Sequence, residues 1–337
     1  MKDPLLIIPI LASFLVTLFL MPIWIKKAKQ IGLLWEDKNK LGKEKIAGSG
    51  GLVVLVGFII SVFIFVAYRT FYFKETSYLI QIISLTAVVL LAAGVGLIDD
   101  LLGWQHGGLS KRSRLIMIAI SAIPLMAINA GRHAISLPIF GTVDFGLLYP
   151  LVLIPLGIVG ATVTFNFLAG FNGLEAGQGA ILLSALALVA FVTGNSWLAL
   201  INLFMVFALL AFLIYNFVPA RVFPGDVLTY AVGSLIAITA ILGSFEKVAI
   251  FFFIPYILET ILKLRGKLGK HSFGKPQKDG SLELLHGKIY GLTHLSIWLL
   301  KKLGIKPTEK KVVYSIWLFQ IIVIAVGLII FREGIFS

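Results

Sequence analysis

The chain has 337 residues and a formal net charge of +13; it is 59% hydrophobic and only 13% charged, and it contains no cysteine. A soluble domain is about one quarter charged, so this composition excludes a soluble globular protein and indicates a polytopic membrane protein. The lack of cysteine excludes disulfides and thiolate metal sites. The positive charge does not imply a nucleic-acid partner, because membrane proteins carry basic loops beside anionic lipid.

Apolar stretches of nearly 20 residues recur along the whole sequence. We therefore predict an all-α polytopic membrane protein with about ten transmembrane helices, forming a single domain over residues 1–337. The first stretch is too long for a signal peptide and no small-residue cleavage site follows it, so we interpret it as a retained helix. The predicted spans are 4–25, 52–72, 79–98, 115–130, 147–168, 179–193, 196–216, 227–243, 247–264 and 312–331.

Lysine and arginine set the predicted orientation. Most of them, 23 of 29, lie in loops that fall on one side of a ten-span topology. The positive-inside rule places that side in the cytoplasm. We therefore expect a multi-pass protein, in the cell membrane if prokaryotic, whose active site faces the cytoplasm. The cytoplasmic catalytic loops would be 26–51, 99–114, 169–178, 217–226 and 262–311.

The most polar junction is residues 166–179, which read NFLAGFNGLEAGQG between the apolar stretches 147–164 and 180–193. Two Asn, one Glu, one Gln and four Gly at a junction between helices are difficult to explain by packing alone. They supply carboxamides, the carboxylate of Glu175 and backbone N–H groups at a membrane face. This combination predicts a binding site for a polar, phosphorylated ligand.

Two adjacent carboxylates, Asp99 and Asp100, end the third apolar stretch. Neighbouring carboxylates at a membrane boundary require a cation, basic partners or a shared proton, although a solvated helix end is the simpler interpretation. Mg²⁺ is the natural cation for carboxylates and also binds phosphates. Lys111, Arg112 and Arg114 follow in the next loop and could bind the same phosphates, while the positive-inside rule also explains part of this charge.

The sequence VFPGD at 222–226 places Asp226 at the start of the eighth predicted span. An aspartate there is often only an N-cap, but capping and metal ligation do not exclude each other. Phe223 offers an aromatic face for a base, although aromatic residues are also common at membrane interfaces. The segment GSGG at 48–51 is either a simple helix start or a backbone nest for anions.

The longest predicted loop contains His271, His286 and His294 among many lysines. Lys270, His271 and Lys275 are close enough in sequence to neutralise a diphosphate, whereas a basic membrane surface explains the lysines but not the histidine. All the singled-out carboxylates, carboxamides and histidines fall on the predicted cytoplasmic side in separate loops. Their convergence predicts one composite site for a phosphorylated, metal-bound ligand.

These motifs together resemble the polyprenyl-phosphate N-acetylhexosamine-1-phosphate transferases, the ten-span family of the bacterial phospho-MurNAc-pentapeptide translocase. Residues 96–100, 166–178 and 222–226 carry the resemblance, and DKNK at 37–40 and residues 292–320 extend it over nearly the whole chain. The string NGLEAGQ at 172–178 is most similar to the archaeal and eukaryotic dolichyl-phosphate branch. Ala47 and Gly48 replace the Pro-Glu that the family has before its Gly-Gly.

The resemblance implies a role for each motif. Asn166 and Asp226 would hold Mg²⁺, or Mn²⁺ in its place, on the diphosphate of the sugar nucleotide. Asn172 would face the uracil, Phe223 would stack on it, and Glu175 would also contact the substrate.

The same resemblance assigns the acidic pair and the basic loops. Asp99 and Asp100 would position or deprotonate the lipid phosphate, with Asp100 as base and Asp99 as orienter; the reverse assignment and a supporting role for the metal are alternatives. His271 would be the family's loop histidine, with His286 and His294 as rivals. Arg114 stands where the family has lysine, which keeps the charge but not the geometry. The remaining basic residues expected at the substrates are Lys111, Lys270 and Lys275.

The implied reaction transfers GlcNAc-1-phosphate from UDP-GlcNAc to polyprenyl or dolichyl phosphate and releases UMP, feeding a glycan pathway such as N-glycosylation. A bacterial-type undecaprenyl-phosphate transferase and a different UDP-N-acetylhexosamine donor are alternatives, and a homodimer is compatible with the sequence. A cation-coupled secondary transporter would require internal repeats and carboxylates near mid-membrane, and neither is visible. A non-catalytic membrane scaffold would not need three polar clusters on one face.

Overall fold

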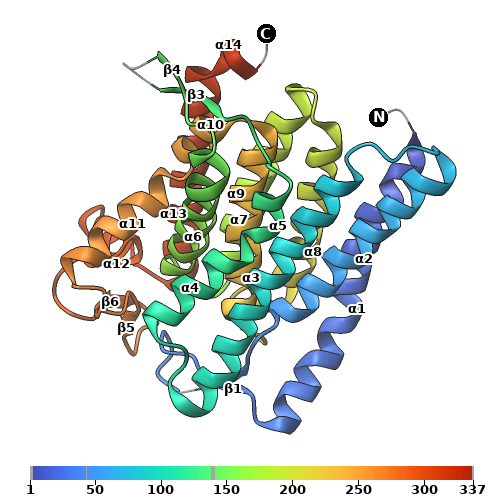
Figure 1. The fold of residues 1–337 in the computed structure, drawn as a ribbon. Helices are drawn as coiled ribbons and strands as arrows, with labels where there is room; N and C mark the ends of the chain where they lie inside the picture. Colours follow the sequence, from blue (N-terminus) through green and yellow to red (C-terminus); the bar gives the residue numbers. More distant parts are fainter. Residues whose placement is uncertain (1–2, 43, 138–140, 336–337) are drawn as a thin grey trace.

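The computed structural model describes residues 3–42, 44–137 and 141–335 (Figure 1). Within these residues the chain is a helical bundle, and its strands form only three two-stranded antiparallel hairpins. The elements in chain order are η1 (Pro4–Leu6), α1 (Ile7–Ile31), β1 (Leu34–Glu36), β2 (Lys45–Ala47), α2 (Gly51–Ala67), η2 (Tyr68–Tyr72), α3 (Leu79–His106), α4 (Lys111–Ser121), α5 (Ile123–Ala127), β3 (Ala134–Leu137), β4 (Gly141–Asp144), η3 (Tyr149–Leu153), α6 (Ile154–Phe167), α7 (Leu174–Val192), α8 (Ser196–Asn216), α9 (Gly225–Gly243), α10 (Glu246–Phe252), α11 (Ile254–Arg265), β5 (Gly274–Pro276), β6 (Leu282–Leu284), α12 (Leu292–Lys302), α13 (Glu309–Ile330) and α14 (Arg332–Ile335).

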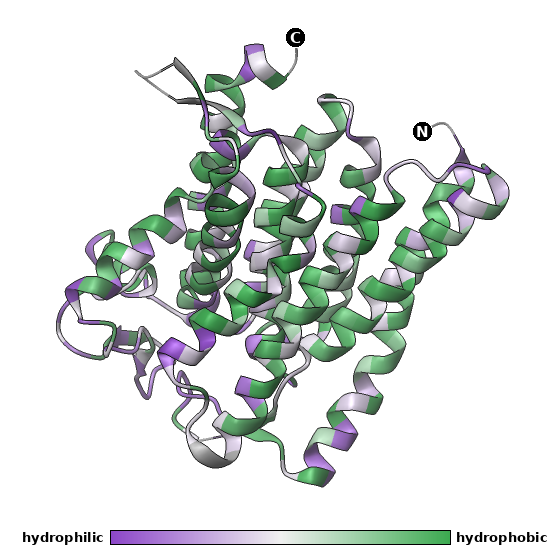
Figure 2. Cartoon of the chain, viewed as in Figure 1, coloured by the Kyte–Doolittle hydropathy of each residue, from purple (hydrophilic) through white to green (hydrophobic). Residues whose placement is uncertain are grey.

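The described part of the chain contains eight helices that are long and apolar enough to cross a bilayer. This confirms the predicted all-α polytopic membrane fold. Figure 2 shows apolar residues over the length of the bundle, whereas hydrophilic residues gather at the end that carries β5, β6 and the start of α4. The eight segments are Pro4–Ile31, Gly51–Tyr72, Leu79–Trp104, Tyr149–Phe167, Leu174–Val192, Ser196–Asn216, Gly225–Gly243 and Glu309–Ile330.

The two other predicted spans, 115–130 and 247–264, are interrupted helices. The first corresponds to α4 and α5, and the second to α10 and α11. Pro124 and Pro255 stand in the first turn of α5 and of α11. Proline lacks an N–H and clashes with the preceding turn, so each helix ends before its proline and a new one begins. The ten predicted spans are thus eight continuous helices and two broken ones.

Several of the predicted loops between spans contain regular secondary structure. Helix α3 continues to His106, so Asp99 and Asp100 lie within a helix rather than in a loop. Helix α7 begins at Leu174, so Glu175 belongs to its first turn. The predicted loop 262–311 contains the β5–β6 hairpin and α12. Hydropathy marks where apolar residues stop, whereas a helix can continue into polar sequence beyond that point.

Helix α9 lies in the centre of the bundle and packs against α3, α6, α2 and α7. Every residue from Val227 to Ile241 along this helix is buried. The contact with α3 is unusually close at Gly96, where an added Cβ would lie 2.4 Å from the Asp226 carbonyl oxygen. The absence of a side chain at Gly96 therefore fixes how closely the first turn of α9 approaches the acidic end of α3.

Candidate functional site

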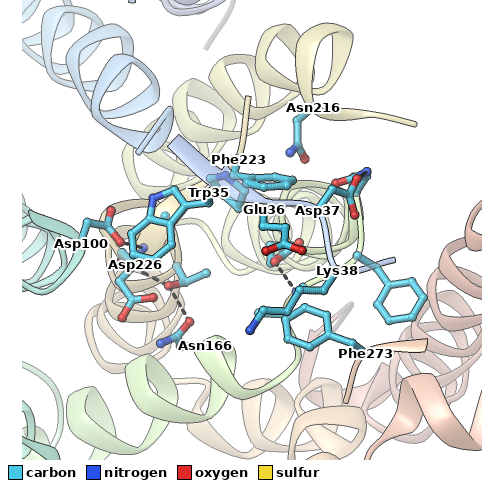
Figure 3. A pocket seen from close by; sticks show the side chains of 18 residues that line it. Trp35, Glu36, Asp37, Lys38, Asp100, Asn166, Asn216, Phe223, Asp226 and Phe273 are labelled. Carbon is cyan, nitrogen blue, oxygen red and sulfur yellow. Dashed lines mark hydrogen bonds between the residues drawn. The ribbon is translucent and has the colours of Figure 1, made fainter. Parts of the chain in front are cut away.

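A cavity of about 280 Å³ opens at the hydrophilic end of the bundle (Figure 3). Its walls come from β1 and the turn after it, the acidic end of α3, the ends of α6 and α8, the loop between α6 and α7, and the start of α9. Segments far apart in sequence thus converge as predicted. The predicted site residues that line the cavity are Asp100, Asn166, Asn172, Glu175, Phe223 and Asp226.

Asp100 fastens the start of α9. One of its carboxylate oxygens accepts a hydrogen bond from the Asp226 N–H at 2.7 Å, and the other accepts from the Ser49 hydroxyl at 2.9 Å and the Val227 N–H at 3.4 Å. Gly225 has φ +73°, and a Cβ there would lie 2.2 Å from Asp100 Oδ2. A carboxylate at a helix N-terminus satisfies free N–H groups and interacts favourably with the helix dipole. Asp100 therefore positions Asp226.

The segment 48–51 is a clamp rather than an anion site. The N–H groups of Gly50 and Gly51 donate to the carbonyls of Phe223 and Pro224, each at 2.9 Å. These amides are consequently not available to a phosphate, so the nest interpretation was wrong and the helix-start interpretation is confirmed. The clamp holds Phe223 and α9 against the start of α2.

Among the described residues, the Asp226 side chain lacks the hydrogen bonds that hold Asp100. No described residue donates a hydrogen bond to its side chain, and its neighbour at hydrogen-bonding range is Asp99, another carboxyl group. Asp99 itself accepts from the Leu109 N–H at 2.6 Å and pairs with Arg114 at 2.9 Å. Two carboxyl groups in contact require a proton or a cation between them. The carboxamide oxygen of Asn166, which accepts from a neighbouring hydroxyl, lies beside this cluster (Figure 3).

The oxygen atoms of Asp226 and Asn166 are ligands of the kind that a hard divalent cation prefers. The described residues contain no group of three or more His, Asp or Glu placed to hold a metal ion. Mg²⁺, however, is usually bound through one or two carboxylates, with water and substrate phosphates completing its coordination. The oxygens of Asp226 and Asn166 match that partial set, so a metal here would depend on substrate for its remaining ligands.

Asn172 is held in a buried network on the opposite wall. Its carboxamide donates to Asp37 at 2.9 Å, and its backbone N–H donates to Glu309 at 3.0 Å. Glu309, the first residue of α13, also forms an ion pair with Lys40. Both Asn172 and Asp37 are at most 4% exposed. Segment 37–40, which the sequence linked to the site only by resemblance, thus orients the predicted uracil-binding carboxamide.

Asn39 connects three segments around the cavity. Its carboxamide donates to the Gly170 carbonyl at 2.7 Å and accepts from the Gly274 N–H at 3.0 Å. Glu175 holds the same loop, since its Oε1 accepts from the Gly170 N–H at 2.7 Å. The other oxygen, Glu175 Oε2, is buried and finds no hydrogen-bond partner among the described residues. Glu175 therefore shapes the cavity wall from within the protein.

The predicted basic residues do not line the cavity. Arg114 is engaged by Asp99, and Lys111, Lys270 and Lys275 are exposed. His271 is also exposed at the rim, with its ring 5.8 Å from that of Phe273, which lines the cavity. The pKa of His271 is lowered, mainly because part of its ring is shielded from solvent and secondly because Lys38 and Lys263 carry positive charges nearby. The imidazole is therefore neutral near pH 7 until an anion approaches.

His294 has a structural role. It is fully buried, its Nδ1 accepts from the Tyr290 N–H at 3.3 Å, and its Nε2 lies 3.0 Å from the Phe273 carbonyl. Because Nδ1 is an acceptor, the ring proton is on Nε2 and donates to that carbonyl. Both ring nitrogens are occupied by backbone groups, so of the three loop histidines His271 and His286 are left to contact a substrate.

Sequence reasoning missed several residues of the cavity wall. Trp35 lies between Asp226 and Phe223 in Figure 3, and its indole fills the space beside Gly48, where a Cβ would approach it to 2.4 Å. The Lys38 ammonium lies 5.0 Å from the centre of the Phe273 ring. Lys38 belongs to the DKNK motif itself and Trp35 lies two residues before it, so an aromatic residue close to that motif was the available signal.

Comparisons with known proteins agree with this geometry. Residues 82–244 match the family described as Glycosyl transferase family 4. The chain is 34% identical to a protein of Saccharolobus solfataricus over 96% of both chains, and 30% identical to one of Sulfolobus acidocaldarius over 94% of this chain and 93% of the relative. Both relatives are provisionally named UDP-N-acetylglucosamine–dolichyl-phosphate N-acetylglucosaminephosphotransferase.

A bacterial relative extends the same similarity. The phospho-N-acetylmuramoyl-pentapeptide-transferase of Halalkalibacterium halodurans is 30% identical over 79% of this chain and 86% of its own length. The matched region 82–244 contains the acidic end of α3, the polar junction before α7 and the start of α9, which together build much of the cavity. The chain is an integral membrane protein that belongs to glycosyl transferase family 4.

Proposed function

We propose that this protein transfers GlcNAc-1-phosphate from UDP-GlcNAc to a dolichyl or other polyprenyl phosphate, releasing UMP. The observation that carries the proposal is the convergence of Asn166, Asn172, Phe223 and Asp226 on one cavity at the hydrophilic end of the bundle. The names of the archaeal relatives favour the dolichyl branch, since the chain is 34% identical to the Saccharolobus solfataricus protein and 30% identical to the bacterial relative.

The nucleotide is expected to occupy the cavity itself. Phe223 offers a ring face for uracil, and the buried carboxamide of Asn172 is preoriented by Asp37 to recognise its edge. Stacking of a base on an aromatic ring contributes about 1–3 kcal/mol. The diphosphate then extends toward Asn166 and Asp226, where Mg²⁺, or Mn²⁺ in its place, would bind.

The chemical difficulty lies in the repulsion between two phosphorylated substrates. The attacking oxygen of the lipid phosphate is already ionised, so the reaction depends more on positioning and charge stabilisation than on a general base. Mg²⁺ would neutralise the diphosphate and help UMP to leave. Lys270, Lys275 and Lys111 would supply further positive charge as the substrates bind, and His271 would do so once it is protonated.

The acidic pair is expected to act mainly by positioning. Both oxygens of Asp100 accept hydrogen bonds from protein groups, and Asp99 is held by Arg114 and the Leu109 amide. These contacts favour Asp100 as the residue that positions Asp226. Asp99 would be a second carboxylate beside Asp226, and a bound metal would reduce the repulsion between the two. Basic residues dominate the end of the bundle where the cavity opens, so we place this end at the cytoplasmic face.

Activity can be tested with the purified full-length protein, radiolabelled UDP-GlcNAc, a short polyprenyl phosphate and Mg²⁺. We expect label in the lipid phase, UMP release, and loss of both with EDTA. Asp226→Asn should abolish transfer and the stabilisation by Mg²⁺ with UMP, whereas Asp279→Asn, at an exposed turn, should retain both. Product from a different UDP-N-acetylhexosamine would change only the donor, and no product with any donor or lipid would refute the transferase.

Asn166→Ala extends the test to the second metal ligand. It should also abolish Mg²⁺-dependent transfer while the protein remains folded and inserted, because a single remaining carboxylate holds the cation weakly. Thermal unfolding in Mg²⁺ with and without UMP separates loss of metal binding from loss of fold. Full activity of both Asp226→Asn and Asn166→Ala would contradict the proposed metal site.

A further inference from the structure

A second cavity lies on the same end of the bundle, outside the site described above. It has a volume of about 490 Å³ and lies between the last turns of α1, the β2 strand and the segment that follows α8. None of its lining residues lines the candidate active site. The residues are four cations and four mainly apolar side chains, namely Lys26, Lys29, Lys45 and Arg221 with Pro22, Ile25, Ile46 and Ala220.

The four cations have no carboxylate partner. The ion pairs of the described residues involve other lysines and arginines, and none of these four lies within 4 Å of a carboxylate. Glu36, which is opposite Lys45 in the hairpin register, lines the active-site cavity instead. Four converging cations without a counter-charge repel each other, and an anion between them would relieve this repulsion.

The cation cluster is built into the fold. Pro22, Ile25, Lys26 and Lys29 recur at the spacing that places side chains on one face of a helix. Arg221 is held by its backbone N–H, which donates to the Tyr215 carbonyl at 2.8 Å, and by stacking of its guanidinium 4.7 Å from the Tyr215 ring. A preoriented guanidinium binds a phosphate with less loss of conformational freedom than a free one.

The depth of the cavity suits a lipid headgroup. Helix α1 begins at Ile7, so about 20 residues, the length that crosses the hydrocarbon core, precede Lys26 along the helix. Apolar side chains on α1 below that level are exposed, including Leu15, Phe19 and Ile23. A molecule in this cavity would thus have its charged group among the cations and its acyl chains along the apolar surface of α1.

We propose that this cavity binds the phosphodiester headgroup of an anionic phospholipid from the surrounding membrane. Basic pockets between transmembrane helices at the cytoplasmic boundary are suited to such headgroups. Two of the three segments that line it continue directly into the active site: β2 leads to Ser49, and the segment of Arg221 leads to Phe223 and Asp226. The isolated bridge between Ala47 and Val222 joins these segments just beyond the cavity. A bound headgroup would therefore stabilise the positions of both segments on the side away from the active site.

The test uses full-length protein in nanodiscs and native mass spectrometry with phosphatidylglycerol and phosphatidylcholine. We expect retained phosphatidylglycerol and a higher Tm in its presence, with at least a tenfold loss of retention in the triple variant Lys26→Gln, Lys29→Gln, Arg221→Gln. A second variant, Lys26→Gln, Lys29→Gln, Lys45→Gln, preserves the arginine stack and should lose retention too. The charge-matched control Lys278→Gln, Lys288→Gln, Lys310→Gln alters exposed lysines without ion pairs and should bind normally.

Three results would overturn the proposal. If the control loses as much phosphatidylglycerol retention as the two cavity variants, retention depends only on the overall charge of the protein. Full displacement of phosphatidylglycerol by millimolar inorganic phosphate would assign the cavity to free phosphate. Preferential retention of polyprenyl phosphate over phosphatidylglycerol, abolished by the same variants, would make it part of the substrate site. Because the readout is lipid retention and Tm, the test does not depend on transferase activity.

Discussion

Replacing Gly96 by alanine tests whether the approach of α3 to α9 sets the geometry of the site. The added Cβ would lie 2.4 Å from the Asp226 carbonyl oxygen, 2.5 Å from its carbonyl carbon and 2.7 Å from the Val227 nitrogen. All three are backbone atoms of the first turn of α9, so no side-chain rotation can relieve the overlap. The two helices must separate, and the residue carried away is Asp226.

The size of the effect follows from these distances. Ordinary contact begins at 3.4 Å, so the first turn of α9 must move by about 1 Å. Overpacking of this kind costs about 1–3 kcal/mol, partly offset by the gain of about 0.5–1 kcal/mol when alanine replaces glycine in a helix. A misplacement of about 1 Å at a reacting centre can reduce the rate about 100-fold. We therefore expect a folded protein with a modestly lower Tm and a kcat lower by about two orders of magnitude.

The matched control is Gly94→Ala, two residues earlier on the same helix, where an added Cβ meets nothing within 4 Å. It should keep full activity and an equal or higher Tm. Both variants are measured for transfer of labelled GlcNAc-1-phosphate at saturating UDP-GlcNAc and Mg²⁺, and for thermal unfolding. If the kcat of Gly96→Ala lies within twofold of that of Gly94→Ala, the close helix contact does not position Asp226 and the reasoning fails.

Trp35→Ala should raise the KM for UDP-GlcNAc about tenfold and leave the KM for the lipid phosphate unchanged, because the indole lines the nucleotide cavity; equal changes in both would contradict this. Asn39→Ala removes the hydrogen bonds to Gly170 and Gly274, and should cost about 1–3 kcal/mol of stability in denaturant titrations; an unchanged midpoint would refute its connecting role. Burial lowers the pKa of His294, so its contribution to stability is complete above about pH 6.5 and declines as the pH falls toward the lowered pKa. His294→Gln should therefore flatten the decrease in Tm between pH 7 and pH 5.5, and a steeper decrease would oppose this assignment.

The helical bundle was predictable because hydropathy over about 20 residues is a strong signal in one dimension. Gly and Pro in several predicted spans indicated that some are broken, but the positions of the breaks, before Pro124 and Pro255, were not predicted, since a window average does not register a single missing N–H. The continuation of α3 to His106 was missed for a different reason: polar residues at a helix end resemble a loop in hydropathy. Periodicity and composition thus identify elements better than they identify where the elements end.

Much of the candidate site was also predictable, because the carboxylates, carboxamides and aromatic residue that line it are conspicuous in apolar sequence. The supporting residues were not predicted. Ser49 contacts Asp100 across 51 positions, and Asn39 contacts Gly274 across 235, so neither contact leaves a local pattern. Trp35 was missed because a tryptophan near a membrane boundary is ordinary, and only its packing against Gly48 shows that it closes a cavity wall.

The adjacent aspartates on α3 show why sequence proximity misleads. Successive residues of a helix point about 100° apart, so side chains that neighbour each other in sequence face different surroundings. Asp100 turns to Ser49 and the first N–H groups of α9, whereas Asp99 turns to Arg114 and the Leu109 amide. The pair is therefore two anchors that join α3 to separate segments. Loss of the Asp100 anchor releases the helix that carries Asp226, and loss of the Asp99 anchor releases Arg114 at the start of α4, so the two substitutions should impair the site by different routes.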